Sequence, residues 1–267
     1  MEFTDKGVLI TGAGRGIGKR LALGFAEAGA RIGLLARSKA ELDLARLEIE
    51  HAGGNALRLR ADVRDHEQVR AAVDRMTVNF GGVHILICAA AMHGPIGPFV
   101  ENRPKLWAEA VEVNLVGVMH ACQAVLPQMI ERRSGHIINM GSMASWVATP
   151  TYTIYAASKF ALRGFSEALR REVGIYNVKV SVIYPGGVAT EFGEHLGYKR
   201  KTGLTTPKGL RLTSEGVAET VWKVAQRPRR EVIIPRIMRL SAWMNYFLPG
   251  LTDRMIENRF TRPERLS

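Results

Sequence analysis

Residues 6–18 read KGVLITGAGRGIG, an apolar run followed by four glycines within seven residues. The apolar run predicts a β-strand over residues 6–11, and the residues after it predict a helix over 16–28. Glycines in such a turn allow the backbone to approach a dinucleotide closely, and the helix N-terminus binds the pyrophosphate. The arrangement therefore predicts a dinucleotide site that includes Gly12, Gly14, Arg15, Gly16, Ile17 and Gly18.

The rest of the chain continues the alternation of short apolar strands with longer helices. We expect further strands over residues 31–36, 56–61, 85–88, 136–140, 178–183 and 231–234. We expect the intervening helices over residues 39–52, 67–80, 104–130, 155–176 and 214–226. This alternation is typical of βαβ units, whose right-handed crossovers place helices on both faces of a parallel sheet. The predicted fold is α/β: a single-domain Rossmann-type fold with a doubly wound, mainly seven-stranded parallel sheet.

Composition narrows the class of protein. The chain has 267 residues, 46% of them hydrophobic and 23% charged, as in ordinary globular proteins. Cys88 and Cys122 lack metal-ligand spacing and are expected to be buried, reduced thiols. No run reaches the roughly 18 apolar residues of a spanning helix. The chain enters its first strand directly, so we expect no signal peptide and a cytoplasmic protein.

The chain carries a net charge of +12, and half of this excess lies in its last sixth. Residues 223–267 contain ten Lys or Arg against four Asp or Glu. A basic surface attracts nucleic acid, anionic lipid or a phosphorylated cofactor. Because no nucleic-acid-binding motif accompanies the charge, nucleic acid is not the expected partner.

Tyr155 and Lys159 lie one helical turn apart and are expected to share a helix face, with Ser142 thirteen residues before the tyrosine. An ammonium near a phenol favours the phenolate, so the pKa of Tyr155 is expected to fall below its usual value of about 10. Such a tyrosine can act as a general acid or base, and a serine hydroxyl beside it can hold a carbonyl or alcohol oxygen. The spacing alone is also common on solvated helix faces.

Together with the glycine loop, these residues resemble the short-chain dehydrogenase/reductase family. The loop matches the family's TGxxxGxG pattern, and the resemblance extends over residues 6–190. It implies the catalytic residues Asn114, Ser142, Tyr155 and Lys159. Tyr155 would transfer the proton, and Lys159 would also hold the nicotinamide ribose. Asn114 would hold a water that links Lys159 to solvent.

The same resemblance implies further cofactor contacts. They are Asp62, Val63, Ala89, Ala90, Tyr155, Lys159, Pro185, Gly186, Val188 and Thr190. The chain departs from the family where an Asn-Asn-Ala-Gly segment is usual, because residues 88–91 read CAAA. We expect Cys88 to replace the first asparagine by apolar packing, and Met92, His93 and Met143 to line the substrate cleft.

The end of the second strand indicates the cofactor. A carboxylate there would bind an adenosine ribose and repel a 2′-phosphate, but residues 36–38 read ARS. Arg37, together with Arg15 in the glycine loop, can clamp a phosphate because guanidinium groups bind phosphate oxygens bidentately. The sequence therefore favours NADP(H), and no metal is expected.

Two regions break the alternation. Residues 191–212 are rich in Gly, Lys and Thr and predict a substrate loop beside the cleft. Residues 235–267 form a helical extension of the catalytic domain, 1–234, with two short amphipathic helices carrying Trp243, Tyr246, Phe247 and Phe260. This extension fits an anionic membrane surface, a dimer contact or a cover over the substrate pocket.

These features lead to a functional hypothesis. We expect an NADP(H)-dependent oxidoreductase that interconverts a carbonyl and an alcohol, on a lipophilic substrate such as a steroid, retinoid, lipid or xenobiotic. The alternatives are a 3-oxoacyl thioester reductase, a non-catalytic dinucleotide-binding protein and a membrane-interaction protein. The family resemblance implies a homodimer or homotetramer, and the C-terminal extension could place the protein at the membrane periphery.

Overall fold

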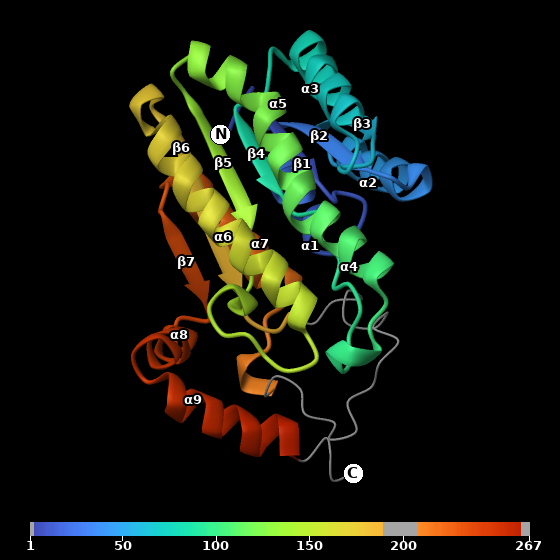
Figure 1. The fold of residues 1–267 in the computed structure, drawn as a ribbon. Coiled ribbons are helices and arrows are strands. Elements are labelled where there is room, and N and C mark those ends of the chain that lie inside the picture. Colours follow the sequence, from blue (N-terminus) through green and yellow to red (C-terminus); the bar gives the residue numbers. More distant parts are fainter. Residues whose placement is uncertain (1–2, 189–207, 263–267) are drawn as a thin grey trace.

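The computed structural model describes residues 3–188 and 208–262, which form one sheet with helices on both sides (Figure 1). All seven strands are parallel, in the order β3-β2-β1-β4-β5-β6-β7. The strands are β1 Gly7–Thr11, β2 Arg31–Ala36, β3 Asn55–Arg60, β4 Ile85–Cys88, β5 Gly135–Met140, β6 Val178–Pro185 and β7 Glu231–Ile234. The predicted seven-stranded, doubly wound fold is confirmed.

The strand order reverses between β1 and β4. From β1 the chain moves outward through β2 to β3, and it then returns to add β4 on the other side of β1. In open parallel sheets a ligand binds at such a switch point, outside the carboxyl ends of the strands. The glycine loop begins at the carboxyl end of β1, so the fold places it at this crevice.

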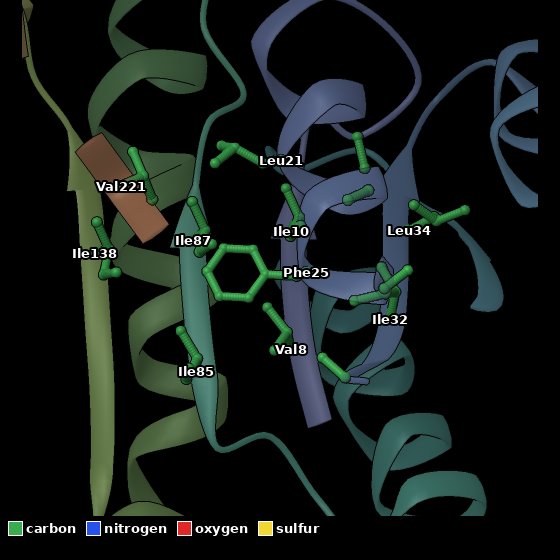
Figure 2. Close-up of a cluster of buried hydrophobic side chains, with 14 of the residues drawn as sticks. Val8, Ile10, Leu21, Phe25, Ile32, Leu34, Ile85, Ile87, Ile138 and Val221 are labelled. Atoms are coloured by element: carbon green, nitrogen blue, oxygen red, sulfur yellow. The ribbon is translucent and has the colours of Figure 1, made fainter. Parts of the chain in front are cut away.

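Two helical layers bury the two faces of the sheet. One layer consists of α1 Gly16–Glu27, α2 Lys39–His51 and α7 Ser214–Gln226, and the other includes α3 His66–Phe80, α5 Gly117–Glu131 and α6 Thr153–Val173. In the first layer, the ring of Phe25 lies among side chains of β1 and β4 such as Val8, Ile10 and Ile87 (Figure 2). These apolar faces follow the helical and strand periods of the sequence.

Side chains at the helix starts explain where several helices begin. Ser38, Asp65 and Thr213 precede α2, α3 and α7, and each side chain accepts a hydrogen bond from a backbone amide of the first turn. Such caps stabilise a helix by about 1 kcal/mol each. Most strands and helices begin and end within three residues of their predicted positions.

The predicted long helix after β4 is present and contains a π-helical turn. It consists of α4 Pro104–Val111, a π-helical turn η2 Glu112–Val116, and α5. Residues 104–131 are long and apolar enough to cross a membrane by length and mean hydropathy alone, contrary to the expectation from the sequence. In the fold, however, this stretch packs against α3, α6 and β4 as a layer of the domain.

The C-terminal extension forms two short helices, as predicted, with the break at Pro249. They are α8 Met238–Phe247 and α9 Pro249–Ile256, followed by a π-helical turn at Glu257–Thr261. Ala242 of α8 packs with Val182, Tyr184 and Ile233 at the ends of β6 and β7. The extension is therefore attached to the domain at the carboxyl end of the sheet.

Candidate active site

The glycine loop is built for close backbone approach. Gly12 has a φ of 70°, and a Cβ there would lie 2.8 Å from the backbone of Ala90. A Cβ on Gly18 would overlap the carbonyl oxygen of Gly12. The N-cap residue of α1, Arg15, forms no side-chain cap, so the helix N-terminus is left for an anionic ligand. This geometry fits a pyrophosphate cradle.

The segment after β4 is joined to this loop. The Ala90 amide donates to Thr11 Oγ1 over 3.2 Å, which ties the ends of β1 and β4 together at the switch point. Cys88 is buried within the apolar cluster and its thiol lies within hydrogen-bonding range of Cys122. Cys88 packs in an apolar environment, as expected, and both cysteines are free and buried.

Arginines gather where β2 and β3 end. Arg37 follows β2, and Arg60 ends β3, where it is the register partner of Ala36. The Arg60 Nε donates to the carbonyl of Arg37 over 3.3 Å. Arg15 lies on the glycine loop with its side chain 58% exposed, at 4.0 Å from Glu41. Arg60 was not predicted as a cofactor contact from the sequence, although the parallel register of β2 and β3 places it beside Arg37.

Asp62 and Val63 lie just after β3, as the resemblance required. The Asp62 carboxylate accepts from the backbone and guanidinium of Arg64, with the Arg64 Nη2 at 2.7 Å. The bond from Arg64 outweighs partial burial and lowers the pKa of Asp62. The Val63 carbonyl lies 3.0 Å from His120 Nδ1, and Val63 packs so closely on Gly117 that a Cβ there would lie 2.7 Å away.

Tyr155 lies in the first turn of α6 and forms a hydrogen bond with Ser142. Ser142 follows β5 and also accepts from the Ala144 amide over 3.1 Å, which holds its hydroxyl at the start of a short 3₁₀ turn. The ring of His93 lies 5.0 Å from the Tyr155 ring, centre to centre. The structure thus brings the predicted serine and tyrosine together at the carboxyl end of the sheet.

Lys159 is buried one turn further along α6, with its Nζ 5.7 Å from the centre of the Tyr155 ring. The ammonium donates to the carbonyl of Met140, at the end of β5, over 2.8 Å. Burial lowers the pKa of Lys159 to about 8. The lysine is therefore charged for the most part at neutral pH, and it is held against the strand and not against the phenol.

The predicted fall in the pKa of Tyr155 is wrong for this structure. Burial raises the pKa of the phenol to about 12, and the hydrogen bond from Ser142 only partly opposes this rise. The physical reason is that desolvation of the phenolate outweighs an ammonium that is bonded elsewhere. In this state the tyrosine carries its proton at neutral pH and is a proton donor.

Asn114 lies in the π-helical turn and is fully buried. Its Oδ1 accepts from the Met92 amide over 2.8 Å, and its Nδ2 donates to the Met92 carbonyl and to Ser158 Oγ. The Ser158 hydroxyl in turn donates to the carbonyl of Tyr155. The side chain therefore braces the segment after β4 against the catalytic helix. The predicted water at Asn114 stays a prediction.

The remaining predicted residues lie beside β6 and β7. Pro185 ends β6, and the Gly186 amide donates to the Ile234 carbonyl over 2.7 Å. Val188 forms an isolated parallel bridge with Leu212, which follows the 3₁₀ turn Lys208–Leu210. Thr190 and the part of the expected substrate loop at 191–207 lie outside the described residues.

A second set of residues supports the loop that carries Ser142, and no sequence pattern predicted it. The Arg163 guanidinium lies 3.3 Å from the centre of the Trp146 ring, which meets Tyr184 edge-on. The Trp146 carbonyl accepts from Asn245 Nδ2 of α8 over 3.0 Å. Trp146 follows Ser142 by four residues, so the C-terminal extension is bonded to the loop that carries the serine.

Among the residues that the structure describes, no cluster of three or more His, Cys, Asp or Glu could hold a metal ion. The structure brings Ser142, Tyr155 and Lys159 together at the carboxyl end of the sheet, beside a cradle for a pyrophosphate. This set can move a proton at an oxygen next to a bound dinucleotide.

Comparison with known proteins agrees with this arrangement. A family model described as short chain dehydrogenase matches residues 6–201. A 3-oxoacyl-[acyl-carrier-protein] reductase from Thermotoga maritima is 32% identical over 83% of this chain and 90% of its own length. A gluconate 5-dehydrogenase from Burkholderia cenocepacia, solved with NADP and tartrate, is 30% identical with a TM-score of 0.79, and the match covers 87% of this chain and 94% of that one.

Not every structural neighbour was solved with NADP. A xylitol dehydrogenase solved with NAD⁺ is 25% identical with a TM-score of 0.78 and covers 88% of this chain and 99% of its own. The family match covers β1 to β6, the glycine loop and the Ser142–Tyr155 site together. The chain therefore belongs to the short-chain dehydrogenase family of oxidoreductases.

Proposed function

We propose that this chain is an NADP(H)-dependent oxidoreductase that interconverts a carbonyl and an alcohol on a small lipophilic substrate. One observation carries the proposal: Tyr155 bonds the Ser142 hydroxyl at the switch-point edge of the sheet, one turn from buried Lys159. A phenol bonded to a hydroxyl, with a buried ammonium one helical turn away and a pyrophosphate cradle nearby, forms a proton-transfer site.

The described residues fit a nicotinamide dinucleotide. Gly12 and Gly18 leave no room for a Cβ, and the uncapped start of α1 offers amides to phosphate oxygens. Ala89 and Ala90 lie against Gly12, and Asp62 and Val63 border the next strand end. When bound, the dinucleotide supplies or accepts the hydride, and the protein provides orientation and electrostatics.

In the reduction, the protonated Tyr155 donates to the substrate carbonyl oxygen as negative charge develops there. The Ser142 hydroxyl, held by its bond to the Ala144 amide, donates to the same oxygen. The Lys159 ammonium stabilises the phenolate that remains, because its charge then has a buried partner. A water at Asn114 would return the proton from solvent through Lys159.

Three arginines support NADP(H) as the cofactor. Arg15, Arg37 and Arg60 lie on the loops and strand ends that border the expected ribose, and no carboxylate ends β2. A bidentate guanidinium contact adds about 1.5–3 kcal/mol to phosphate binding. We therefore expect NADPH to be used at least tenfold more efficiently than NADH.

The neighbours of Tyr155 favour a lipophilic substrate. The rings of His93 and Tyr152 lie 5.9 Å apart, centre to centre, and His93 also faces Tyr155. Met143 follows Ser142 and packs with Trp146 and Met238 near the same edge. A 3-oxoacyl thioester reductase is the second candidate, because a relative carries that activity in its name and the chain is basic. We further propose a cytoplasmic homodimer or homotetramer.

The experiment is an NADPH-oxidation screen of the purified protein against steroids, aldehydes, diketones and acyl thioesters. Turnover of an apolar ketone or aldehyde, with NADPH preferred to NADH, supports the proposal. Turnover of acyl thioesters alone selects the second candidate. NADPH binding without turnover of any substrate, in either direction, contradicts an enzymatic role.

A further inference from the structure

The C-terminal helices present their apolar stripes to solvent. Eight of the sixteen exposed large apolar side chains of the described residues lie between Ile237 and Met255, in a small part of the chain. They are 45–75% exposed, and we call them the outer face: Ile237, Leu240, Trp243, Tyr246, Phe247, Leu248, Leu251 and Met255. A cluster of this kind marks an interaction surface, whereas single exposed apolar residues do not.

The exposed apolar residues recur at a spacing that is typical of one side of a helix. On α8 the stripe follows Leu240, Trp243 and Phe247, and on α9 it follows Leu251 and Met255, with Leu248 exposed between the two helices. Intervals of three and four residues place each set on one side of its helix. The opposite side of α8 is occupied, because Ala242 and Met238 pack on the domain. The outer face is therefore available and faces away from the sheet.

Aromatic rings form the centre of this face. The rings of Trp243 and Phe247 lie 5.1 Å apart, and those of Tyr246 and Phe247 lie 4.9 Å apart. Trp and Tyr prefer the zone between lipid headgroups and acyl chains, where the ring is in an apolar environment and its polar atom meets water. The composition thus matches an interfacial helix pair.

The segment that carries the rings is also positively charged. Residues 236–262 contain five arginines and two acidic residues, a net charge of +3. Glu257 pairs with Arg262, whereas Arg236, Arg239, Arg254 and Arg259 form no ion pair with any residue that the structure describes. Free guanidinium groups beside an apolar stripe complement anionic headgroups.

The charge argues against a second copy as the occupant. In a two-fold contact the same patch meets itself, so two faces of net charge +3 would be brought together. An anionic lipid surface meets the same charge with an opposite one. We infer that the outer face of α8 and α9 docks the protein on an anionic membrane surface.

Docking would also orient the catalytic edge. The extension lies at the end of the molecule toward which β5 and β7 point (Figure 1). Asn245 bonds the Trp146 carbonyl, and Met238 fills the space where Gly186 would carry a Cβ, with its Sδ 2.6 Å from that point. The membrane would therefore face the end of the sheet that carries Tyr155. This inference does not depend on the proposed reaction.

The test is co-sedimentation of the full chain with sucrose-loaded vesicles, either pure phosphatidylcholine or 70:30 phosphatidylcholine:phosphatidylglycerol. We expect binding to the anionic vesicles, weaker binding to the neutral ones and loss of binding at high salt. The triple variant Leu240→Ser/Trp243→Ser/Phe247→Ser should lose at least tenfold in affinity. Its control, Leu44→Ser/Val78→Ser/Ile175→Ser, removes apolar groups elsewhere that are even more exposed, and it should bind as the wild type does.

A variant that lacks three arginines tests the electrostatic contribution to membrane binding. Arg236→Gln/Arg239→Gln/Arg254→Gln should lose about fivefold in anionic-vesicle affinity per arginine, whereas Arg75→Gln/Lys179→Gln/Arg229→Gln, at exposed positions elsewhere, should not. Melting temperatures and NADPH binding would show that each variant is folded. Absence of wild-type vesicle binding, or equal binding by the apolar triple variant, overturns the inference. So does a loss of oligomer mass in that variant without any vesicle binding, which would assign the face to a second copy.

Discussion

The glycine loop and the C-terminal helices lie at the same end of the sheet, but apolar side chains are buried in the first region and exposed in the second. In the loop and the helix behind it, apolar side chains such as Leu21 and Phe25 are buried and glycines are fixed by close backbone contacts. In α8 and α9, side chains of the same type, including Trp243, are exposed. An amphipathic pattern thus predicts that a helix has two faces, and the rest of the fold decides which face meets solvent.

We expect the largest effect from a substitution in the proton-transfer site. Ser142→Ala removes the hydroxyl that bonds Tyr155, so kcat for reduction should fall about 10²- to 10⁴-fold. NADPH affinity should stay within a factor of about three, as measured by fluorescence titration. The control is Ser145→Ala, because the buried Ser145 hydroxyl has no hydrogen-bond partner among the described residues. Equal activity of the two variants would remove Ser142 from the mechanism.

A pair of aromatic substitutions compares the two regions directly. Phe25→Ala opens a cavity between α1 and the sheet and should lower the free energy of unfolding by about 3–5 kcal/mol. Trp243→Ala removes a ring that is 53% exposed and should change it by less than about 0.5 kcal/mol. Urea denaturation of both variants gives the comparison. A large loss from Trp243→Ala would mean that the outer face packs on protein.

Cofactor preference tests whether Arg37, at the end of β2, selects NADPH over NADH. Arg37→Asp replaces a phosphate-binding group with a carboxylate, which suits a free ribose. The ratio of kcat/KM values for NADPH and NADH should fall about ten- to hundredfold. Arg75→Asp changes the same charge on α3 and should leave the ratio unchanged. An unaltered ratio in Arg37→Asp would exclude this arginine from cofactor selection.

Much of the fold and the site follows from the sequence because local rules specify it. The strand–glycine–helix motif, the alternation of elements and the pairing of Ser142 with Tyr155 depend on short-range geometry and the topology of parallel sheets. Arg60 could be assigned to the arginine cluster only from the register of β2 and β3. No periodicity in the sequence predicts the π-helical turn that contains Asn114.

Electrostatics and exposure were harder to predict. The sequence indicated a lowered pKa for Tyr155, but the outcome depends on how strongly the phenol is desolvated and on where Lys159 directs its hydrogen bond. Likewise, the bond between Asn245 and Trp146 joins residues 99 positions apart. Such quantities depend on long-range packing, which a single sequence does not report.

A pH-dependent effect on stability is expected from a buried histidine of the sheet. Burial lowers the pKa of His136 from 6.5 to about 4, so the unfolded chain takes up a proton first as the pH falls. Its contribution is therefore fully present above pH about 6.5 and is lost toward pH 4, with about 2 kcal/mol lost by pH 5. Urea denaturation at pH 7 and pH 5 should show this loss. His136→Asn should reduce it, whereas His51→Asn, at an exposed position of α2, should not.

The central claim is that Tyr155 transfers the proton in a site that binds NADPH independently of it. The most direct measurement is the kcat for reduction of the best carbonyl substrate by Tyr155→Phe, together with the Kd for NADPH. Tyr176→Phe, beyond the end of the same helix, is the control. The account predicts a loss of at least about 10²-fold in kcat, with the Kd within about threefold of the wild type. Retention of wild-type turnover by Tyr155→Phe would contradict it.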